Sequence, residues 1–172
     1  MHGQNFSMIT DMDFSNRQQL LDDTALNRSK GRRSFSPVNL DALKAAGGKL
    51  ILWSGMSDQS VSPQNILNYT RAADSHFGAE RPAFIRTFLA PGMFHCSGGV
   101  NQPTDVPDVM LEAMTRWVEQ GQAPVDVLAN RASDGQPVER TYRLCPWPQQ
   151  SVFTGDKNSV EAINDAGQWQ CR

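Results

Sequence analysis

Two side chains in this sequence have the chemical types and the placement that acid–base catalysis needs. Asp58 and His95 each lie in a loop of small residues that follows a short apolar run, residues 49–53 and residues 84–89 respectively. Such runs are typical of buried parallel strands, and the carboxyl ends of parallel strands meet at one edge of a sheet. A carboxylate at that edge accepts one imidazole N–H and fixes the tautomer, which leaves the other ring nitrogen free as a general base. The sequence therefore predicts that Asp58 orients His95. The alternative is that Asp58 caps a turn and His95 is an ordinary loop histidine.

A nucleophile for this base is not evident in the chain. Ser97 lies in Cys96-Ser97-Gly98-Gly99, but it follows the histidine and not a strand that turns into a helix. Ser57 belongs to the aspartate loop and lacks the second glycine of a Gly-x-Ser-x-Gly elbow. We expect neither serine to be the nucleophile.

The elements that must position the pair follow from apolar periodicity. The pattern predicts strands over 49–53 and 84–89 and helices over 40–46, 63–77 and 108–120, the second with Ser62 as N-cap and Pro63 as its first residue. The last helix has Val109, Met110, Ala113, Met114, Trp117 and Val118 on one side and Gly121 as its stop. Strands that alternate with helices predict two parallel strands joined by right-handed crossovers, and hence an α/β fold. Natural sheets usually have about five or six strands, so two strands suggest a fragment of a larger domain.

The remaining segments carry weaker patterns. Residues 101–107 read as a linker with two prolines, and residues 122–172 as a turn-rich, coil-like tail with an extended stretch at 143–148. Residues 1–36 are polar and poorly periodic, with a possible short helix over 17–26. We expect the globular part to be residues 37–172.

Composition excludes several classes of protein. The chain has 172 residues and a net charge of -2, which fits one domain and gives no electrostatic reason to bind nucleic acid or an anionic membrane. No apolar run approaches the ~20 residues of a membrane span, and the N-terminus has no signal-peptide pattern.

The cysteines are Cys96, Cys145 and Cys171, an odd number with no metal-ligand spacing. We therefore expect no metal site and no cofactor. Cys145 and Cys171 bracket a polar loop, a pattern that fits a disulfide in an oxidising compartment.

Several motifs together resemble the C-terminal part of the tannase/feruloyl esterase family of α/β-hydrolases. They are Gly-Gly-Lys-Leu-Ile-Leu-Trp at 47–53 with Gly55-x-x-Asp58 and Ser62-Pro63, Pro-Gly-Met-Phe-His-Cys-Ser-Gly-Gly at 91–99, Trp-Val-Glu-x-Gly-x-Ala-Pro at 117–124, and Leu-Cys-Pro-Trp-Pro-Gln at 144–149. The resemblance covers roughly residues 37–172. The sequence departs from the family at Ser54 and Met56, where the family usually carries His and Trp.

The resemblance implies a Ser-Asp-His triad that hydrolyses esters of phenolic acids in a secreted or periplasmic enzyme. It makes Asp58 the triad acid, His95 the general base, Cys96 the disulfide partner of a cysteine outside this chain, and Cys145 the partner of Cys171. The Gly-Cys-Ser-x-Gly-Gly nucleophile elbow of the family is not present. We therefore expect a fragment that is inactive by itself and that requires the missing N-terminal half of the enzyme. The alternative is a non-enzymatic interaction or binding module derived from that fold.

Overall fold

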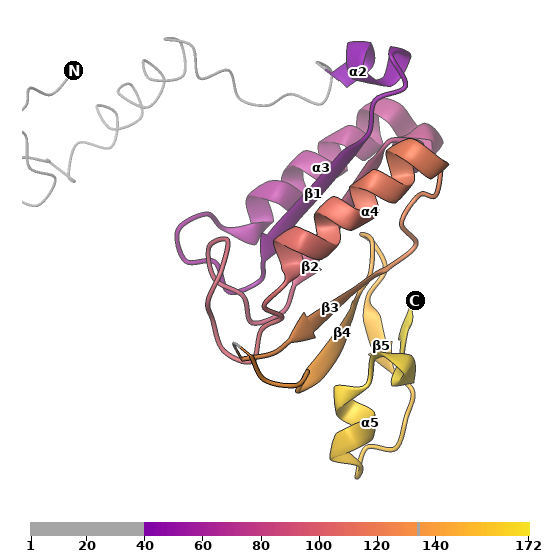
Figure 1. Cartoon of the computed structure of the whole chain (residues 1–172). Helices are drawn as coiled ribbons and strands as arrows, with labels where there is room; N and C mark the ends of the chain where they lie inside the picture. The colour runs from indigo at the N-terminus through magenta and orange to yellow at the C-terminus, as the bar shows by residue number, and fades with distance from the viewer. Residues whose placement is uncertain (1–39, 134) are drawn as a thin grey trace, which may run out of the picture. The chain divides into compact units, whose positions relative to one another are not determined.

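The centre of the fold is a pair of parallel strands. The computed structural model describes residues 40–133 and 135–172. Strand β1 (Leu50–Gly55) lies beside strand β2 (Ile85–Ala90), in a register that runs from Leu50 opposite Ile85 to Gly55 opposite Ala90 (Figure 1). This confirms the predicted parallel pair and brings the loops after both strands to the same edge.

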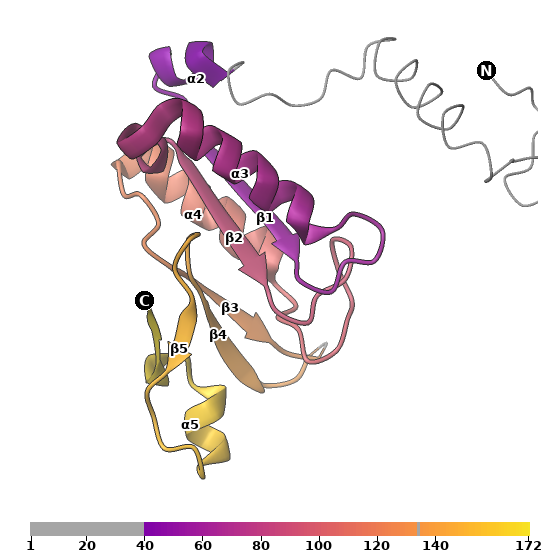
Figure 2. The ribbon, with the colours of Figure 1, turned by 180° about the vertical axis from the view of Figure 1, so that it is seen from behind.

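Two helices cover the opposite faces of this pair. Helix α3 (Pro63–Phe77) lies on one face and helix α4 (Val106–Gln120) on the other, as the front and back views show (Figures 1 and 2). Ser62 caps α3 as predicted, because its hydroxyl oxygen accepts the Gln64 N–H at 3.3 Å. A short helix, α2 (Asp41–Ala45), precedes β1, and a 3-10 segment, η2 (Gly78–Ala83), links α3 to β2.

Helix α4 differs from its prediction at its start and on its surface. It begins at Val106 and not at Asp108, because Pro107 is tolerated in a first turn and therefore does not keep the helix from starting there. Val118 is 62% exposed, so the apolar side of the helix is narrower than predicted. Gly121 ends the helix with a left-handed backbone, as predicted.

The tail contains more regular structure than the sequence pattern indicated. Strands β3 (Val127–Arg131) and β4 (Arg140–Leu144) pair antiparallel, and so do β5 (Ser151–Phe153) and β6 (Trp169–Cys171). Between β5 and β6 lie helix α5 (Val160–Asn164) and the 3-10 turn η3 (Ala166–Gln168). The disulfide between Cys145 and Cys171 joins the end of β4 to β6.

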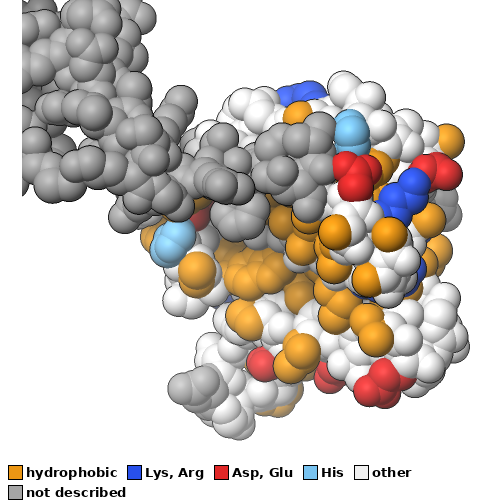
Figure 3. Space-filling view, turned by 90° about the horizontal axis from the view of Figure 1, so that it is seen from above, with side chains coloured by type: hydrophobic (Ala, Val, Ile, Leu, Met, Phe, Trp, Pro, Cys, Tyr) orange, Lys and Arg blue, Asp and Glu red, His pale blue; other side chains and the backbone are white. Residues whose placement is uncertain are grey.

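The core fills the space between the sheet pair and the tail. One cluster joins β2, α4, β3 and β4 through buried side chains such as Phe88, Met110, Ala129 and Leu144, and a smaller one joins α3 to β2. The apolar run at residues 49–53 predicted a buried strand, but β1 is half-buried over most of its length among the described residues. In the described part of the chain only one edge of β1 has a partner strand. In Figure 3 hydrophobic side chains gather in a hollowed area of one face.

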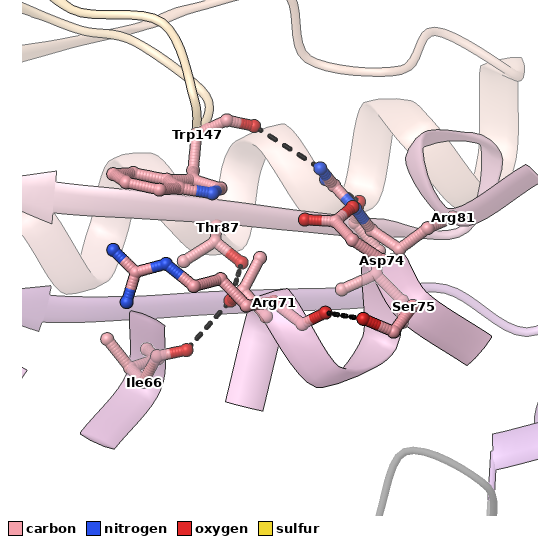
Figure 4. Close-up of polar contacts among 9 residues, drawn as sticks. Ile66, Arg71, Asp74, Ser75, Arg81, Thr87 and Trp147 are labelled. Carbon is pink, nitrogen blue, oxygen red and sulfur yellow. Dashed lines mark hydrogen bonds and ion pairs between the residues drawn. The ribbon is translucent and has the colours of Figure 1, made fainter. Parts of the chain in front are cut away.

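A polar network holds Trp147 of the tail against α3 and β2 (Figure 4). The backbone N–H of Trp147 donates to the Thr87 carbonyl at 2.8 Å. Arg81 donates to the carboxylate of Asp74 at 2.6 Å and to the Trp147 carbonyl at 3.5 Å. The guanidinium of Arg71 lies over the Trp147 ring, 5.1 Å from its centre. These contacts fix the segment that follows Cys145.

Several expectations are not addressed by these residues. The possible helix over 17–26 and the segment 1–36 lie outside the described part of the chain. Within that part, no helix is both long and apolar enough to cross a membrane.

Candidate active site

The structure brings Asp58 and His95 into direct contact. The Nδ1 atom of His95 lies 2.8 Å from Oδ2 of Asp58. Because an ionised carboxylate only accepts hydrogen bonds, Nδ1 carries the proton that is donated, and Nε2 is left with a free lone pair when the ring is neutral. The Asp58 side chain is 5% exposed, whereas that of His95 is 54% exposed. The pair thus has a buried acid and an accessible base.

The backbone of the next residues holds the carboxylate of Asp58. Its Oδ1 atom accepts the N–H groups of Ser60 and Val61, each at 2.8 Å. The Val61 N–H first, and then His95 and the Ser60 N–H, lower the pKa of Asp58 below its ordinary value of 3.8, against the opposing effect of burial. Asp58 is therefore ionised at neutral pH, and both of its oxygens are engaged.

The two loops that carry the pair are joined through their backbones. The Met56 N–H donates to the Ala90 carbonyl at 2.8 Å, and the Ser57 N–H donates to the Met93 carbonyl at 3.0 Å. Gly55 makes this approach possible, because a Cβ atom there would lie 2.3 Å from the Met93 oxygen. The position of Asp58 relative to His95 is thus set by the end of the sheet.

The histidine loop is a compact hairpin closed by its own backbone. Met93 and Gly99 form an isolated antiparallel bridge, the Phe94 N–H donates to the Gly98 carbonyl at 2.9 Å, and the Val100 N–H donates to the Gly92 carbonyl at 3.0 Å. Gly92 has a positive φ of 67°, and a Cβ atom there would lie 2.2 Å from the Val100 oxygen. This closure positions His95 at the tip of the hairpin.

The cysteine next to the histidine is free and exposed. Cys96 has a φ of 62°, an uncommon backbone conformation for a residue other than glycine. Cys145 and Cys171 are bonded to each other, as the resemblance implied, so neither is available to Cys96.

The two serines near the site do not contact the base. Ser57 and Ser97 are exposed, and in residues 40–133 and 135–172 no serine or threonine hydroxyl is hydrogen-bonded to His95. Within the same residues no group of three His, Cys, Asp or Glu side chains is placed to hold a metal ion.

Sequence reasoning did not identify every residue that builds the site. The N–H groups of Ser60 and Val61 were missed because the type of a residue does not show what its backbone N–H binds. An aspartate before small residues is nevertheless a signal for such a turn. Gly55 was noted only as part of a motif, and its position directly after a strand was the available signal of a close backbone approach.

Comparison with known proteins connects this geometry to one family. A sequence model described as "Tannase and feruloyl esterase" matches residues 5–168. A probable feruloyl esterase from Arthroderma benhamiae is 36% identical over 135 residues, which cover 76% of this chain and 25% of that protein. A mono(2-hydroxyethyl) terephthalate hydrolase from Piscinibacter sakaiensis is 38% identical over 139 residues, which cover 78% of this chain and 21% of that protein.

Solved structures give the same result for the fold. An esterase from Aspergillus oryzae superimposes with a TM-score of 0.66 and 31% identity, over 77% of this chain and 29% of that chain. Feruloyl esterase B from the same organism superimposes with a TM-score of 0.67 and 26% identity, over 77% of this chain and 28% of that chain. The architecture is therefore that of the α/β-hydrolase-like esterases.

The chain spans about a quarter of the length of these relatives. The family match nevertheless extends over almost all of it. On these grounds the chain belongs to the tannase and feruloyl esterase family.

Proposed function

We propose that this chain supplies the acid and the base of a Ser-Asp-His carboxylic ester hydrolase. Asp58 orients His95, and His95 acts as general base toward a serine that lies outside these 172 residues. The observation that carries the proposal is the 2.8 Å hydrogen bond from Nδ1 of an exposed histidine to a carboxylate held by two backbone N–H groups. That arrangement is the one required of the acid–base pair in nucleophilic ester hydrolysis.

The chemistry follows from the tautomer. Nε2 of His95 removes the proton from the serine hydroxyl as its oxygen attacks the ester carbonyl, and Asp58 stabilises the imidazolium that forms. The imidazolium then gives its proton to the leaving alcohol oxygen, and the C–O bond of the ester breaks. A water molecule, deprotonated by the same nitrogen, attacks the acyl-enzyme, and the imidazolium returns this proton to the serine oxygen as the acid is released. His95 thus takes up and gives back a proton twice in each cycle.

The proposed substrates are esters of phenolic acids. Membership in the family and the name of one relative, a probable feruloyl esterase, support this class, and the terephthalate ester hydrolase shares with it an aromatic acid group. We further propose that Cys96 forms a disulfide with a cysteine beside the nucleophilic serine, which would tie the histidine loop to the nucleophile. The exposed, unpaired state of Cys96 supports that pairing.

The proposed location is outside the cytoplasm, either secreted or periplasmic. The Cys145–Cys171 disulfide supports it, because disulfides persist in oxidising compartments.

A chimeric enzyme tests the proposal. Residues 37–172 of this chain would replace the matching C-terminal part of the Aspergillus oryzae feruloyl esterase B, which supplies its own serine. We expect hydrolysis of a feruloyl ester, and we expect Asp58→Asn or His95→Gln to lower kcat by about 10³-fold or more. His76→Gln is the matched control, because His76 also contacts a carboxylate, Asp41, at 3.2 Å, but outside the proposed site.

Two results would contradict the proposal. A folded chimera that keeps its rate of hydrolysis after His95→Gln would show that His95 takes no part in the reaction. A purified 172-residue chain that hydrolyses the ester faster than buffer, with a rate lost on Ser57→Ala or Ser97→Ala, would place the nucleophile within this chain. A folded chimera with no activity would favour the alternative, a binding module derived from the esterase fold.

A further inference from the structure

A cavity of about 700 Å³ lies between strand β2, strand β4 and the part of the tail that follows β4. Its volume falls in the range of small-molecule sites, roughly 300–1,000 Å³. Leu67 and Leu89 contribute apolar surface from α3 and β2, and Tyr142, Trp147 and Trp169 contribute aromatic rings from β4 and the tail. Neither Asp58 nor His95 lines it, although Met56, Pro91 and Gly92 from their two loops do.

The charged residues that line the cavity are two arginines, and no acidic residue lines it. Arg143 already has partners, since it pairs with Asp126 and donates to the Ala166 carbonyl at 3.2 Å. Arg140 has no carboxylate partner among the described residues, and its Nε atom is buried without a hydrogen-bond acceptor. The acidic residue before it, Glu139, is already paired with Arg131 at 3.1 Å.

Aromatic rings hold the guanidinium of Arg140 without satisfying its donors. Its central carbon lies over the Tyr142 ring at 4.5 Å from the ring centre and over the Trp169 ring at 5.7 Å. Such contacts engage the flat faces of the guanidinium, whereas its N–H groups donate in its plane. A buried N–H without an acceptor is unfavourable, and a carboxylate would provide two acceptors in the geometry of the arginine fork.

The aromatic walls are fixed before any ligand binds. Trp147 is held by its backbone N–H, which donates to the Thr87 carbonyl. The guanidinium of Arg71 lies over its ring (Figure 4). Trp169 donates its indole N–H to the Ile163 carbonyl at 3.0 Å. The Cys145–Cys171 disulfide joins the strand ends on which Tyr142 and Trp169 lie. A site built from held groups loses little conformational freedom on binding.

We propose that this cavity is a binding site for a monocyclic aromatic carboxylate. The Arg140 guanidinium binds the carboxylate group, and the ring of the ligand lies among Tyr142, Trp147 and Trp169. The site is independent of the proposed ester hydrolysis, because it uses neither the acid–base pair nor a serine.

Benzoate, benzamide and acetate are the probes, titrated into the purified full chain by calorimetry. Benzamide has the ring without the charge, and acetate has the charge without the ring. We expect benzoate to bind with one-to-one stoichiometry and at least tenfold more tightly than either of the other two. Arg140→Gln should lower the affinity for benzoate at least tenfold, to that for benzamide. Arg131→Gln should leave it within twofold, since Arg131 lies opposite Arg140 in the strand pair but does not line the cavity.

The indole N–H signals in an NMR spectrum locate the ligand without any substitution. The chain has four tryptophans. Benzoate should shift the signals of Trp147 and Trp169, which line the cavity, and leave those of Trp53 and Trp117, which do not. Four results would each overturn the proposal. They are no binding of benzoate, equal affinity for benzoate and benzamide, equal affinity for benzoate and acetate, and shifts confined to Trp53 and Trp117. These outcomes remain decisive if Arg140→Gln does not fold.

Discussion

The Cα atom of Gly55 lies so close to the Met93 carbonyl that no side chain fits between them. A Cβ atom at residue 55 would lie 2.3 Å from the Met93 oxygen and 2.4 Å from the Phe94 oxygen. Both neighbours are backbone atoms, so a rotamer change cannot relieve the overlap. The last residue of β1 therefore determines how near the aspartate loop comes to the histidine loop.

We expect Gly55→Ala to separate the two loops. The overlap forces backbone movement, which costs about 1–3 kcal/mol in the free energy of unfolding and lengthens the Asp58–His95 contact. Denaturant unfolding measures the first effect, and the chemical shift of the His95 Nδ1 proton measures the second. Gly47→Ala is the control, because a Cβ atom there meets nothing within 4 Å although φ is 72°. It should cost about 1–2 kcal/mol through backbone conformation alone and leave the His95 signal unchanged. An unchanged His95 signal in Gly55→Ala would contradict the expectation.

The pH dependence of the aspartate loop follows from the lowered pKa of Asp58. Because the folded pKa lies below the ordinary value of 3.8, the carboxylate stabilises the loop fully above that value. This stabilisation is lost as the pH falls through the lower, folded pKa. In an NMR titration the Ser60 and Val61 N–H signals should move with a midpoint below 3.8. The transition should disappear in Asp58→Asn, and a wild-type midpoint at or above the ordinary value would contradict the expectation.

The strand pair and the placement of Asp58 and His95 could be predicted because each loop follows an apolar run. The apolar runs before the two loops are long enough to indicate strands, and Ser62 and Gly121 mark the ends of the helices by well-known preferences. Parallel pairing then places both loops at one edge without further information.

The strands of the tail could not be predicted because they are short. The cavity could not be predicted because the residues that line it are far apart in the sequence. Strand β4 alternates Arg140, Tyr142 and Leu144, but five residues are too few to separate a strand from an extended loop. The free Nε of Arg140 depends on which side chains surround it, and the rings beside its guanidinium come from Tyr142 of β4 and Trp169 of β6. Residue type alone carries no record of such an arrangement.

The Cys145–Cys171 disulfide should contribute measurably to stability. It closes a loop across a sequence separation of 26 residues, for which a chain-entropy estimate gives about 3.5 kcal/mol. We expect the paired substitution Cys145→Ala with Cys171→Ala to lower the free energy of unfolding by roughly 2–4 kcal/mol. Cys96→Ala is the matched control, since Cys96 is exposed and unpaired, and it should change the value by less than about 0.5 kcal/mol. An equal effect of the two changes would contradict the expectation.

The buried hydroxyl groups of Thr70 and Thr87 should respond differently to substitution, because they have different roles in one hydrogen bond. Both residues are 0% exposed, and their hydroxyl oxygens lie 2.8 Å apart. Thr70 already donates its one hydroxyl proton to the Ile66 carbonyl at 2.8 Å, so Thr87 must be the donor of the shared bond.

Replacing either threonine with valine keeps the shape of the side chain. The two substitutions differ in which partner of the shared hydrogen bond they remove, the acceptor at Thr70 or the donor at Thr87. Thr70→Val leaves the Thr87 hydroxyl proton buried without an acceptor, which costs about 1–3 kcal/mol. Thr87→Val leaves the Thr70 bond to Ile66 intact, and it should cost only about 0.5–1.5 kcal/mol. Denaturant unfolding of the two variants measures the difference. The double variant should cost less than the sum of the single ones, because the unpaired donor is then absent. A larger loss for Thr87→Val than for Thr70→Val would mean that the shared proton belongs to Thr70 and that the bond to Ile66 is not made.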